Sequence, residues 1–274
     1  MTLFDAFRFD GKRVLVVGGA SGMGAAAAQL ALDAGAEVLV ADIAPITADG
    51  VQAIAIDLAD TDSIDAAVEA LDGPVHVLLG AAGVADGTAG LERINFLGHR
   101  YLIERLLAAD LLPRGAAIGL ISSAAGLGWE SNLPLLQEYL AIPDFHDAAR
   151  WVVGQGKADY MFSKQAVCAY VATQALTLRA RGIRINAICP GATDTPLARA
   201  NAERWLGFGT DYREAAGVEV SQPIEQAGPL LFLCSAAASS ITGTILTADH
   251  GYFTAGVSGS FPAATPVVTF MLGR

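Results

Sequence analysis

Residues 13–24 read RVLVVGGASGMG, a short β-branched run that leads directly into a glycine loop. The loop spaces Gly18, Gly22 and Gly24 as GxxxGxG, and the alanine-rich residues 25–35 that follow predict a helix ended by a glycine. A glycine loop between a strand and a helix lets the backbone approach a pyrophosphate closely, and the helix N-terminus attracts its charge. By itself, such a loop is as typical of an ordinary tight turn as it is of a dinucleotide-binding site.

Alternating strands and helices continue through most of the chain. Strands are expected within residues 13–19, 37–42, 51–57, 75–83, 116–126, 183–191 and 243–251, and helices within 22–35, 61–73, 91–110, 159–182 and 222–238. Near-continuous apolar strands separated by helices predict a parallel sheet covered on both faces. The sequence therefore predicts a doubly wound, Rossmann-like α/β fold, with residues 1–274 forming a single dinucleotide-binding catalytic domain.

Two segments interrupt this alternation. Residues 129–157 separate the fifth strand from the next helix, and we expect them to form an inserted helical subdomain. Residues 252–274 form a C-terminal tail without a charge before Arg274. A further segment, residues 198–215, carries Trp205, Phe208 and Tyr212 and is a candidate lid.

Composition excludes several classes of protein. Hydrophobic residues make up 53% of the chain and charged residues 16%, which excludes intrinsic disorder. The formal net charge of −11 repels phosphate backbones and argues against a nucleic-acid partner. No apolar run reaches the ~18 residues of a membrane span, and no basic segment followed by an apolar stretch predicts a secretory signal. We therefore expect a cytoplasmic protein with no membrane partner.

Cysteine and histidine are too dispersed to predict a metal site. The cysteines are odd in number and without CxxC spacing, so we expect small buried hydrophobic residues at Cys168, Cys189 and Cys234. The histidines are His76, His99, His146 and His250. No metal cofactor is expected from this distribution.

An acidic residue at the end of the second strand indicates that the glycine loop binds a dinucleotide. Asp42 lies 18 positions beyond Gly24, close to the ~20 expected of a carboxylate that binds the adenosine ribose. A carboxylate there accepts bonds from a 2′-hydroxyl and repels a 2′-phosphate, which favours NAD over NADP. Asp57 ends the third strand and could meet the adenine, while residues 80–83 allow close backbone approach after the fourth.

The stretch ADYMFSKQAV carries the candidate chemistry. Tyr160 and Lys164 are four residues apart and therefore share one face of a helix. A free tyrosine has a pKa near ~10, and a nearby ammonium group brings that pKa toward a useful range for a general base. The alternative is a packed tyrosine beside a solvated lysine. With only three lysines in the chain, a chance pair at this spacing is improbable.

From about residue 11 to 251, the chain resembles the short-chain dehydrogenase/reductase family. The matching motifs are the glycine loop, Asp42, Asp57, Asn95, ISSAAG, YMFSK and CPGATDTP, all in order. The resemblance implies four catalytic residues: Tyr160 as acid/base, Lys164 on the nicotinamide ribose, Ser123 orienting the substrate oxygen, and Asn95 anchoring a water in a proton relay. The cofactor-binding set is Gly18, Ala20, Ser21, Gly22, Met23, Gly24, Asp42, Asp57, Leu58, Ala81, Ala82, Gly83, Tyr160, Lys164, Pro190, Gly191, Thr193 and Thr195.

The chain departs from the family pattern in three places. The usual Asn-Asn-Ala-Gly is GAAG at residues 80–83, which removes a structural brace behind the cofactor. The usual glycine pair near the last strand is replaced by DHG at residues 249–251, in which His250 is either a satisfied loop histidine or a contact to a partner subunit. Ser123 and Tyr160 are 37 positions apart (160 − 123), far more than in most members. This insertion resembles the 3α-hydroxysteroid dehydrogenase and coniferyl-alcohol dehydrogenase branch, in which it obstructs a tetramer interface, so a homodimer is favoured.

We therefore expect an NAD-dependent oxidoreductase that interconverts a bulky apolar secondary or aromatic alcohol and its carbonyl. The apolar residues of the insertion either bury one another or line the pocket, and the tail packs across a partner or over the pocket. Two alternatives stay open: an NADPH-dependent ketone reductase, and a non-catalytic NAD-sensing or scaffold protein. The intact catalytic set argues against the second.

Overall fold

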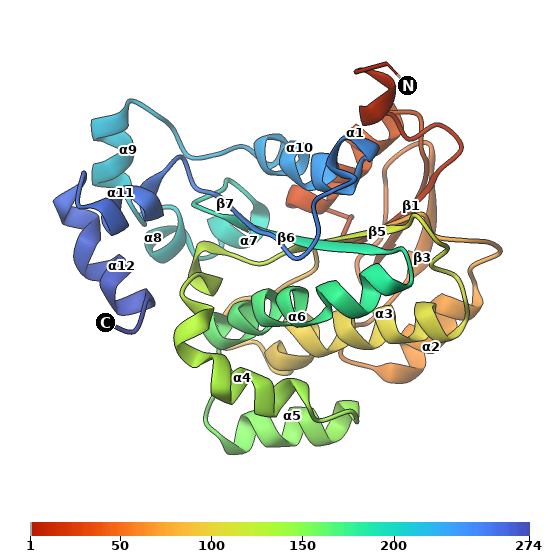
Figure 1. Cartoon of the computed structure of the whole chain (residues 1–274), viewed down its shortest axis with the longest axis horizontal. Coiled ribbons are helices and arrows are strands. Elements are labelled where there is room, and N and C mark those ends of the chain that lie inside the picture. Colours follow the sequence, from red (N-terminus) through yellow and green to blue (C-terminus); the bar gives the residue numbers. More distant parts are fainter. Residues whose placement is uncertain (1) are drawn as a thin grey trace.

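The computed structural model describes residues 2–274 and is built on one seven-stranded parallel sheet of order β3-β2-β1-β4-β5-β6-β7 (Figure 1). The order of the strands reverses between β1 and β4, and ligands of such sheets bind at the carboxyl edge near that switch point. The predicted doubly wound α/β fold is confirmed. The strands are β1 (Arg13–Val17), β2 (Glu37–Asp42), β3 (Val51–Ala55), β4 (Val77–Gly80), β5 (Ala117–Ile121), β6 (Arg184–Pro190) and β7 (Ile245–Ala248).

Helices cover both faces of the sheet (Figure 1). One face carries α1 (Gly22–Asp33) and α10 (Pro223–Cys234), which pack on each other, with the short 3₁₀ segments η1 (Asp5–Phe7) and η5 (Ala236–Ala238) nearby. The other face carries α2 (Thr61–Glu69), α3 (Gly98–Ala108) and α6 (Tyr160–Ala180). A π-helical segment, η2 (Arg93–Leu97), leads into α3.

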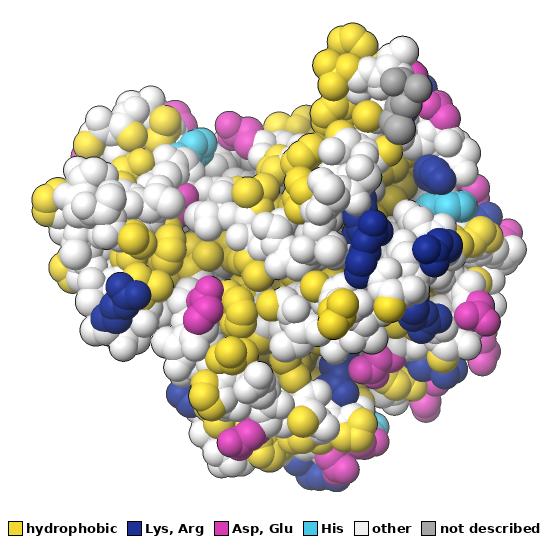
Figure 2. Space-filling view, in the orientation of Figure 1, with side chains coloured by type: hydrophobic (Ala, Val, Ile, Leu, Met, Phe, Trp, Pro, Cys, Tyr) yellow, Lys and Arg dark blue, Asp and Glu magenta, His cyan; other side chains and the backbone are white. Residues whose placement is uncertain are grey.

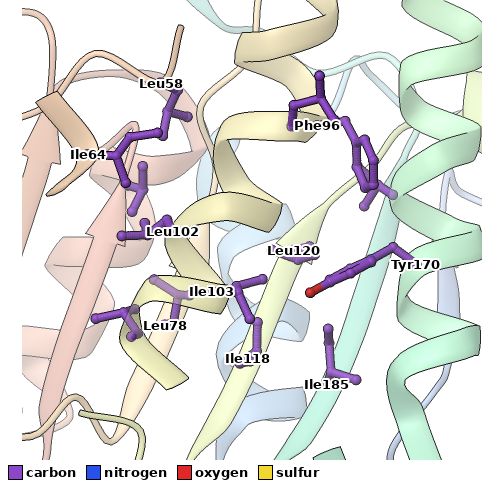
Figure 3. Close-up of a cluster of buried hydrophobic side chains, with 14 of the residues drawn as sticks. Leu58, Ile64, Leu78, Phe96, Leu102, Ile103, Ile118, Leu120, Tyr170 and Ile185 are labelled. Atoms are coloured by element: carbon purple, nitrogen blue, oxygen red, sulfur yellow. The ribbon is translucent and has the colours of Figure 1, made fainter. Parts of the chain in front are cut away.

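The two faces divide the core into two clusters by the period-two alternation of the strands. In β1, Leu15 and Val17 point to the α2–α3–α6 side, whereas Val14 and Val16 point to the α1–α10 side. Figure 3 shows part of the first cluster, with Tyr170 of α6 directed toward the strands. Because both faces are buried, the strands carry apolar residues at successive positions instead of an alternating polar pattern.

The insertion forms two helices, α4 (Leu133–Leu140) and α5 (Phe145–Gly154), after the 3₁₀ segments η3 (Ala124–Gly126) and η4 (Trp129–Asn132). Helix α4 packs against α6, and α5 packs against η2. The Tyr139 ring is 1% exposed and lies within 6 Å of the rings of Phe96, Trp151 and Phe162. The insertion therefore extends the main hydrophobic core and does not stand apart from it.

A lobe beside the carboxyl edge gathers the remaining helices (Figure 1). They are α8 (Ala202–Trp205), α9 (Thr210–Ala216), α11 (Tyr252–Ser258), η6 (Pro262–Ala264) and α12 (Thr265–Met271). The short helix α7 (Pro196–Arg199) lies between β6 and α8 in the chain and contacts α8. Aromatic contacts join the candidate lid to the tail: Phe208 and Tyr212 both contact the Tyr252 ring, and Tyr212 also contacts Phe261. The C-terminal tail, for which the sequence predicts no secondary structure, is thus two helices. None of the helices in residues 2–274 combines the length and apolarity that crossing a bilayer needs.

Candidate active site

The carboxyl ends of the strands bring the candidate site together from segments far apart in sequence. The glycine loop follows β1, Asp42 ends β2, and Gly83 follows β4. Ser123 lies two residues beyond β5, and Pro190 ends β6. Parallel strands end at the same sheet edge, so these residues lie side by side although more than 170 positions separate the first from the last.

The glycines of the loop are required by close packing as well as by access. Gly18 has a φ of +82°, and a Cβ at this position would lie 2.3 Å from the Ala82 backbone nitrogen. A Cβ on Gly24 would lie 2.0 Å from the Gly18 carbonyl oxygen. The loop, the start of α1 and the end of β4 can therefore approach one another only without side chains here.

The start of α1 and Asp42 fit the pyrophosphate and ribose of a dinucleotide. Ser21, the N-cap residue of α1, makes no side-chain capping bond, so first-turn N–H groups remain available to an anion. One Asp42 oxygen accepts a hydrogen bond from Ala20 N at 2.9 Å, and the other accepts from Ala44 N at 2.9 Å. Each carboxylate oxygen keeps a second lone pair for a ribose hydroxyl.

Ser123, Tyr160 and Lys164 line one cavity of about 580 Å³. The insertion does not separate them, because the end of β5 is tied directly to α6. Ser122 Oγ donates to the Lys164 carbonyl oxygen at 2.8 Å, and Lys164 Nζ donates to the Ile121 carbonyl oxygen at 3.1 Å. A Cβ on Gly126 would lie 2.4 Å from Ser122 Oγ, so only glycine permits this approach.

Burial dominates the ionisation of the tyrosine and the lysine. It raises the pKa of Tyr160 to about 12, against a hydrogen bond from Ser123 that lowers it. It lowers the pKa of Lys164 to about 8, because an ammonium group loses its hydration in this site. Lys164 Nζ lies 5.6 Å from the centroid of the Tyr160 ring. The two groups are therefore adjacent, and desolvation moves their pKa values apart, from nearly equal ordinary values to about 12 and about 8. The pKa of Tyr160 thus shifts in the direction opposite to the lowering that the sequence predicts.

Asn95 lies in the π-helical segment outside the cavity lining, and its side chain is already bonded. Its Oδ1 accepts from Val84 N at 2.7 Å, while Nδ2 donates to Val84 O at 3.0 Å and to Ser163 Oγ at 3.2 Å. Asn95 therefore braces the loop after β4 against α6. Its expected part in a proton relay stays a prediction.

The expected cofactor residues fall into two groups. The cavity is lined by Met23, Ala81, Gly83, Tyr160, Lys164, Pro190, Gly191, Thr193 and Thr195. Outside its lining are Gly18, Ala20, Ser21, Gly22, Gly24, Asp42, Asp57, Leu58 and Ala82. In this second group Leu58 is 4% exposed and its side chain belongs to the core.

The rest of the cavity wall comes largely from the lobe. Trp205 and Phe208 of the candidate lid line it, together with Val267, Phe270 and Met271 of the tail. Figure 2 shows hydrophobic side chains gathered where the lobe meets the body of the molecule. No residue of 129–157 lines the cavity, so the apolar residues of the insertion bury one another and the core.

Sequence reasoning missed several lining residues. The tail residues gave a weak signal, an uncharged and aromatic-containing end. Met161 lies inside the YMFSK motif and Arg204 inside the candidate lid, although neither was singled out. No local pattern marks Asp86 or Leu197, because only tertiary contacts place them at the cavity.

Comparisons with known proteins identify the family. Residues 145–253 match the family described as enoyl-(acyl carrier protein) reductase. The chain is 31% identical over 263 residues to a cis-4-hydroxycyclohexanecarboxylate dehydrogenase of Sinomonas cyclohexanicum, covering 89% of this chain and 97% of that one. The chain belongs to the short-chain dehydrogenase/reductase family, and it is an oxidoreductase.

Two further proteins are similar to this short-chain dehydrogenase/reductase, one by sequence and one by structure. A coniferyl-alcohol dehydrogenase of a Pseudomonas species (strain HR199) is 29% identical, with 88% of this chain and 96% of that one covered. The 3α-hydroxysteroid dehydrogenase of Pseudomonas sp. B-0831, solved with NADH, superposes with a TM-score of 0.74 at 27% identity, covering 91% of this chain and 99% of that one.

The departures of this dehydrogenase from the family pattern have structural explanations. A Cβ on Gly80 would lie 2.9 Å from His99 Nδ1, so the imidazole fills the space behind the GAAG turn. His99 Nε2 donates to the Ala82 carbonyl oxygen at 3.0 Å and provides a brace there. His250 has a φ of +58° and is hydrogen-bonded to Ser221 Oγ at 2.8 Å.

The remaining cysteines and histidines give no sign of a metal centre. Within residues 2–274, no group of three or more His, Cys, Asp or Glu side chains could hold a metal ion. Cys168 and Cys189 lie with their Sγ atoms 3.8 Å apart, and the third cysteine is buried separately. All three are buried and free.

Proposed function

We propose that this enzyme is an NAD-dependent dehydrogenase that interconverts a bulky, neutral, apolar secondary or aromatic alcohol and its carbonyl. The observation that carries the proposal is the convergence of Ser123, Tyr160 and Lys164 on one cavity at the sheet edge beside the glycine loop. Hydroxysteroid-like and coniferyl-alcohol-like compounds are the substrate classes that this cavity suits, in keeping with two of the relatives.

The side chains divide the proton chemistry among them. Tyr160 takes the hydroxyl proton of the alcohol, while the Ser123 hydroxyl hydrogen-bonds to the substrate oxygen as it becomes a carbonyl. Ser123 Oγ accepts from Ala125 N at 3.2 Å, which leaves its own proton to donate. Lys164 holds the nicotinamide ribose and stabilises the phenolate. A bound oxidised nicotinamide would accept the hydride and bring a positive charge, a redox capacity that the side chains lack.

The charges at the cavity support a neutral substrate. Lys164 bonds the Ile121 carbonyl, and Arg204 pairs with Asp86 at 3.3 Å. The acidic side chains are also engaged: Asp159 accepts from Phe162 N, and Asp86 accepts from a backbone N–H of α6. Among residues 2–274 the lining cations are Lys164, which we assign to the nicotinamide ribose, and Arg204, which pairs with Asp86. The walls from the lid and tail are apolar and aromatic, as a neutral substrate requires.

The preference for NAD rests on Asp42. Its carboxylate is fixed by Ala20 N and Ala44 N at the end of β2, where a 2′-phosphate would meet a negative charge. The glycine loop between β1 and α1 has no lysine or arginine to offset that charge.

We also infer a cytoplasmic homo-oligomer, with a dimer favoured. Helix α4 covers part of α6, which removes that surface from helix-on-helix association. Light scattering after size-exclusion chromatography measures the assembly directly. A tetramer in solution would contradict this inference.

The test is an activity panel with NAD and NADP. Neutral steroid and aryl-allylic alcohols should reduce NAD, and a hydroxycyclohexanecarboxylate should be a poor substrate. Tyr160→Phe should lower kcat by about 10²–10⁴-fold, because it removes the general base, while NAD binding measured by calorimetry persists. Tyr101→Phe, a tyrosine on α3 bonded to Asp65, is the matched control and should turn over normally.

Two outcomes would contradict the proposal separately. Wild-type turnover in Tyr160→Phe would remove the proposed base. A strong preference for NADP would overturn the cofactor assignment and leave the alcohol chemistry intact.

A further inference from the structure

Asp86, in the loop after β4, contacts the catalytic helix from outside it. Its Oδ1 accepts a hydrogen bond from Tyr160 N at 2.7 Å. Tyr160 is the first residue of α6, and the N–H groups of a helical first turn have no partner inside the helix. The helix's own N-cap residue, Asp159, takes Phe162 N at 2.8 Å. Asp86 therefore adds a second acceptor, supplied from 74 positions away, at the residue that carries the proposed base.

The other oxygen of Asp86 reaches the lid. Its Oδ2 lies 3.3 Å from Arg204 Nη1 on α8. The next residue, Trp205, places its ring 4.8 Å from the Tyr160 ring, centroid to centroid. The Asp86 carboxylate thus joins the backbone of Tyr160 to Arg204. Arg204 directly precedes Trp205, whose ring packs on the Tyr160 ring. Since the side chains of Asp86 and Arg204 are 38% and 76% exposed, the ion pair adds orientation more than stability.

The charged groups around Tyr160 are few. Asp86 faces it from the loop after β4, and Lys164 from α6 itself, while Asp159 precedes it in the chain. Arg204 of α8 reaches the site through its pair with Asp86, and the titratable thiol of Cys189 faces Tyr160 from β6. Asp86 and Cys189 raise the pKa of the phenol, after the larger effect of burial. A change at Asp86 therefore acts on both the position and the ionisation of Tyr160.

We propose that Asp86 is a positioning residue, which fixes the first turn of α6 through Tyr160 N and holds the lid segment 202–208 over the Tyr160 ring through Arg204. The proposal rests on the function proposed above for Tyr160. It assigns a role to Asp86, a loop residue that belongs to none of the sequence motifs named above.

Two substitutions separate the two contacts. Asp86→Asn keeps an acceptor for Tyr160 N and loses the charge, whereas Asp86→Ala loses both. For Asp86→Asn we expect a kcat near that of the wild type, a KM for bulky alcohols raised severalfold, and the rising limb of the pH–rate profile moved to lower pH. The limb moves that way because the carboxylate that raises the phenol pKa is gone. Asp86→Ala should also lower kcat by about tenfold, the loss expected for a charge-assisted hydrogen bond.

Arg204→Gln and a distant control complete the design. Arg204→Gln should raise KM as Asp86→Asn does, and the double variant should be no worse than either, because both remove one ion pair. The control is Asp147→Asn, which breaks an exposed pair with Arg150 on α5 and should match the wild type. An unmoved pH limb together with an unchanged KM in Asp86→Asn would overturn the proposal, since misfolding would lower only the active fraction.

A measurement that needs no substrate tests the positioning role of Asp86 separately from the proposed function. Hydrogen exchange, followed by mass spectrometry, should be faster in residues 200–208 and 159–163 of Asp86→Ala than in the wild type. Exchange in α5 should be unchanged. Equal exchange rates in Asp86→Ala and wild type would refute the positioning role even if the enzyme oxidises every alcohol of the panel. Faster exchange without any alcohol oxidation would refute the function alone.

Discussion

At the scale of the residue, His99 replaces the amide brace that the GAAG turn lacks. It is fully buried, donates to the Ala82 carbonyl, and fills the space that a side chain at position 80 would need. Burial lowers the pKa of His99 to about 4, with the nearby Lys164 charge acting in the same direction. The imidazole is therefore neutral in the folded enzyme at physiological pH.

This neutrality predicts acid sensitivity of the fold. The pKa of His99 is about 4 when folded and 6.5 when unfolded, so the unfolded chain binds more protons between these values. Stability from this group is complete above pH 6.5 and is lost as pH falls toward 4, by about 2 kcal/mol at pH 5. Urea unfolding of the wild type and of His99→Gln, from pH 8 to pH 5, measures the difference. Parallel curves for the two proteins would contradict the prediction.

At the scale of the element, α12 decides the shape of the substrate side of the cavity. Met271 is buried among Leu127, Cys168 and Cys189, and a Cβ at Gly128 would lie 1.9 Å from the Met271 carbonyl oxygen. The helix is therefore anchored at its end against the start of the insertion. Val267 and Phe270 line the cavity from the same helix.

Phe270 should select substrates without supporting the fold. Its side chain is 70% exposed, so Phe270→Ala should change the free energy of unfolding by no more than about 0.5 kcal/mol. The KM for bulky alcohols should rise about tenfold, because an aromatic wall is lost, while small alcohols are unaffected. Steady-state kinetics on substrates of graded size provide the measurement. Phe4→Ala, 79% exposed at the N-terminal segment, is the control that should leave KM unchanged.

At the scale of the whole molecule, the insertion and the sheet share one core. Leu136 and Tyr139 of α4 belong to the same buried cluster as Leu78 of β4 and Ile118 of β5. Because one contiguous core unfolds as a unit, the insertion should not melt separately.

Leu136→Ala tests this unity. Leu136 is 0% exposed, so the truncation should cost about 2–5 kcal/mol, and the transitions followed by far-UV and near-UV circular dichroism should shift together. The KM per folded enzyme should be unchanged, because no residue of 129–157 lines the cavity. Two separate transitions, or a raised KM, would show instead that the insertion is an independent part of the substrate site.

The primary structure by itself determined the sheet, its covering helices and the edge where ligands bind. Those features follow from local patterns: apolar strands buried on both faces, glycines at Gly18 and Gly24 where no Cβ fits, and a Tyr160–Lys164 pair one helical turn apart. Each pattern depends on neighbours within a few residues, so it can be read without the rest of the molecule.

Only the tertiary structure decided what surrounds the proposed base. Asp86 reaches Tyr160 from 74 positions away, His99 occupies the space above Gly80, and α12 supplies the wall that the insertion does not. These contacts join segments that are far apart in the sequence, and no repeating pattern of residues marks them as neighbours. They are set by how packed helices and loops meet across the sheet edge, and no local preference of the residues involved encodes that geometry.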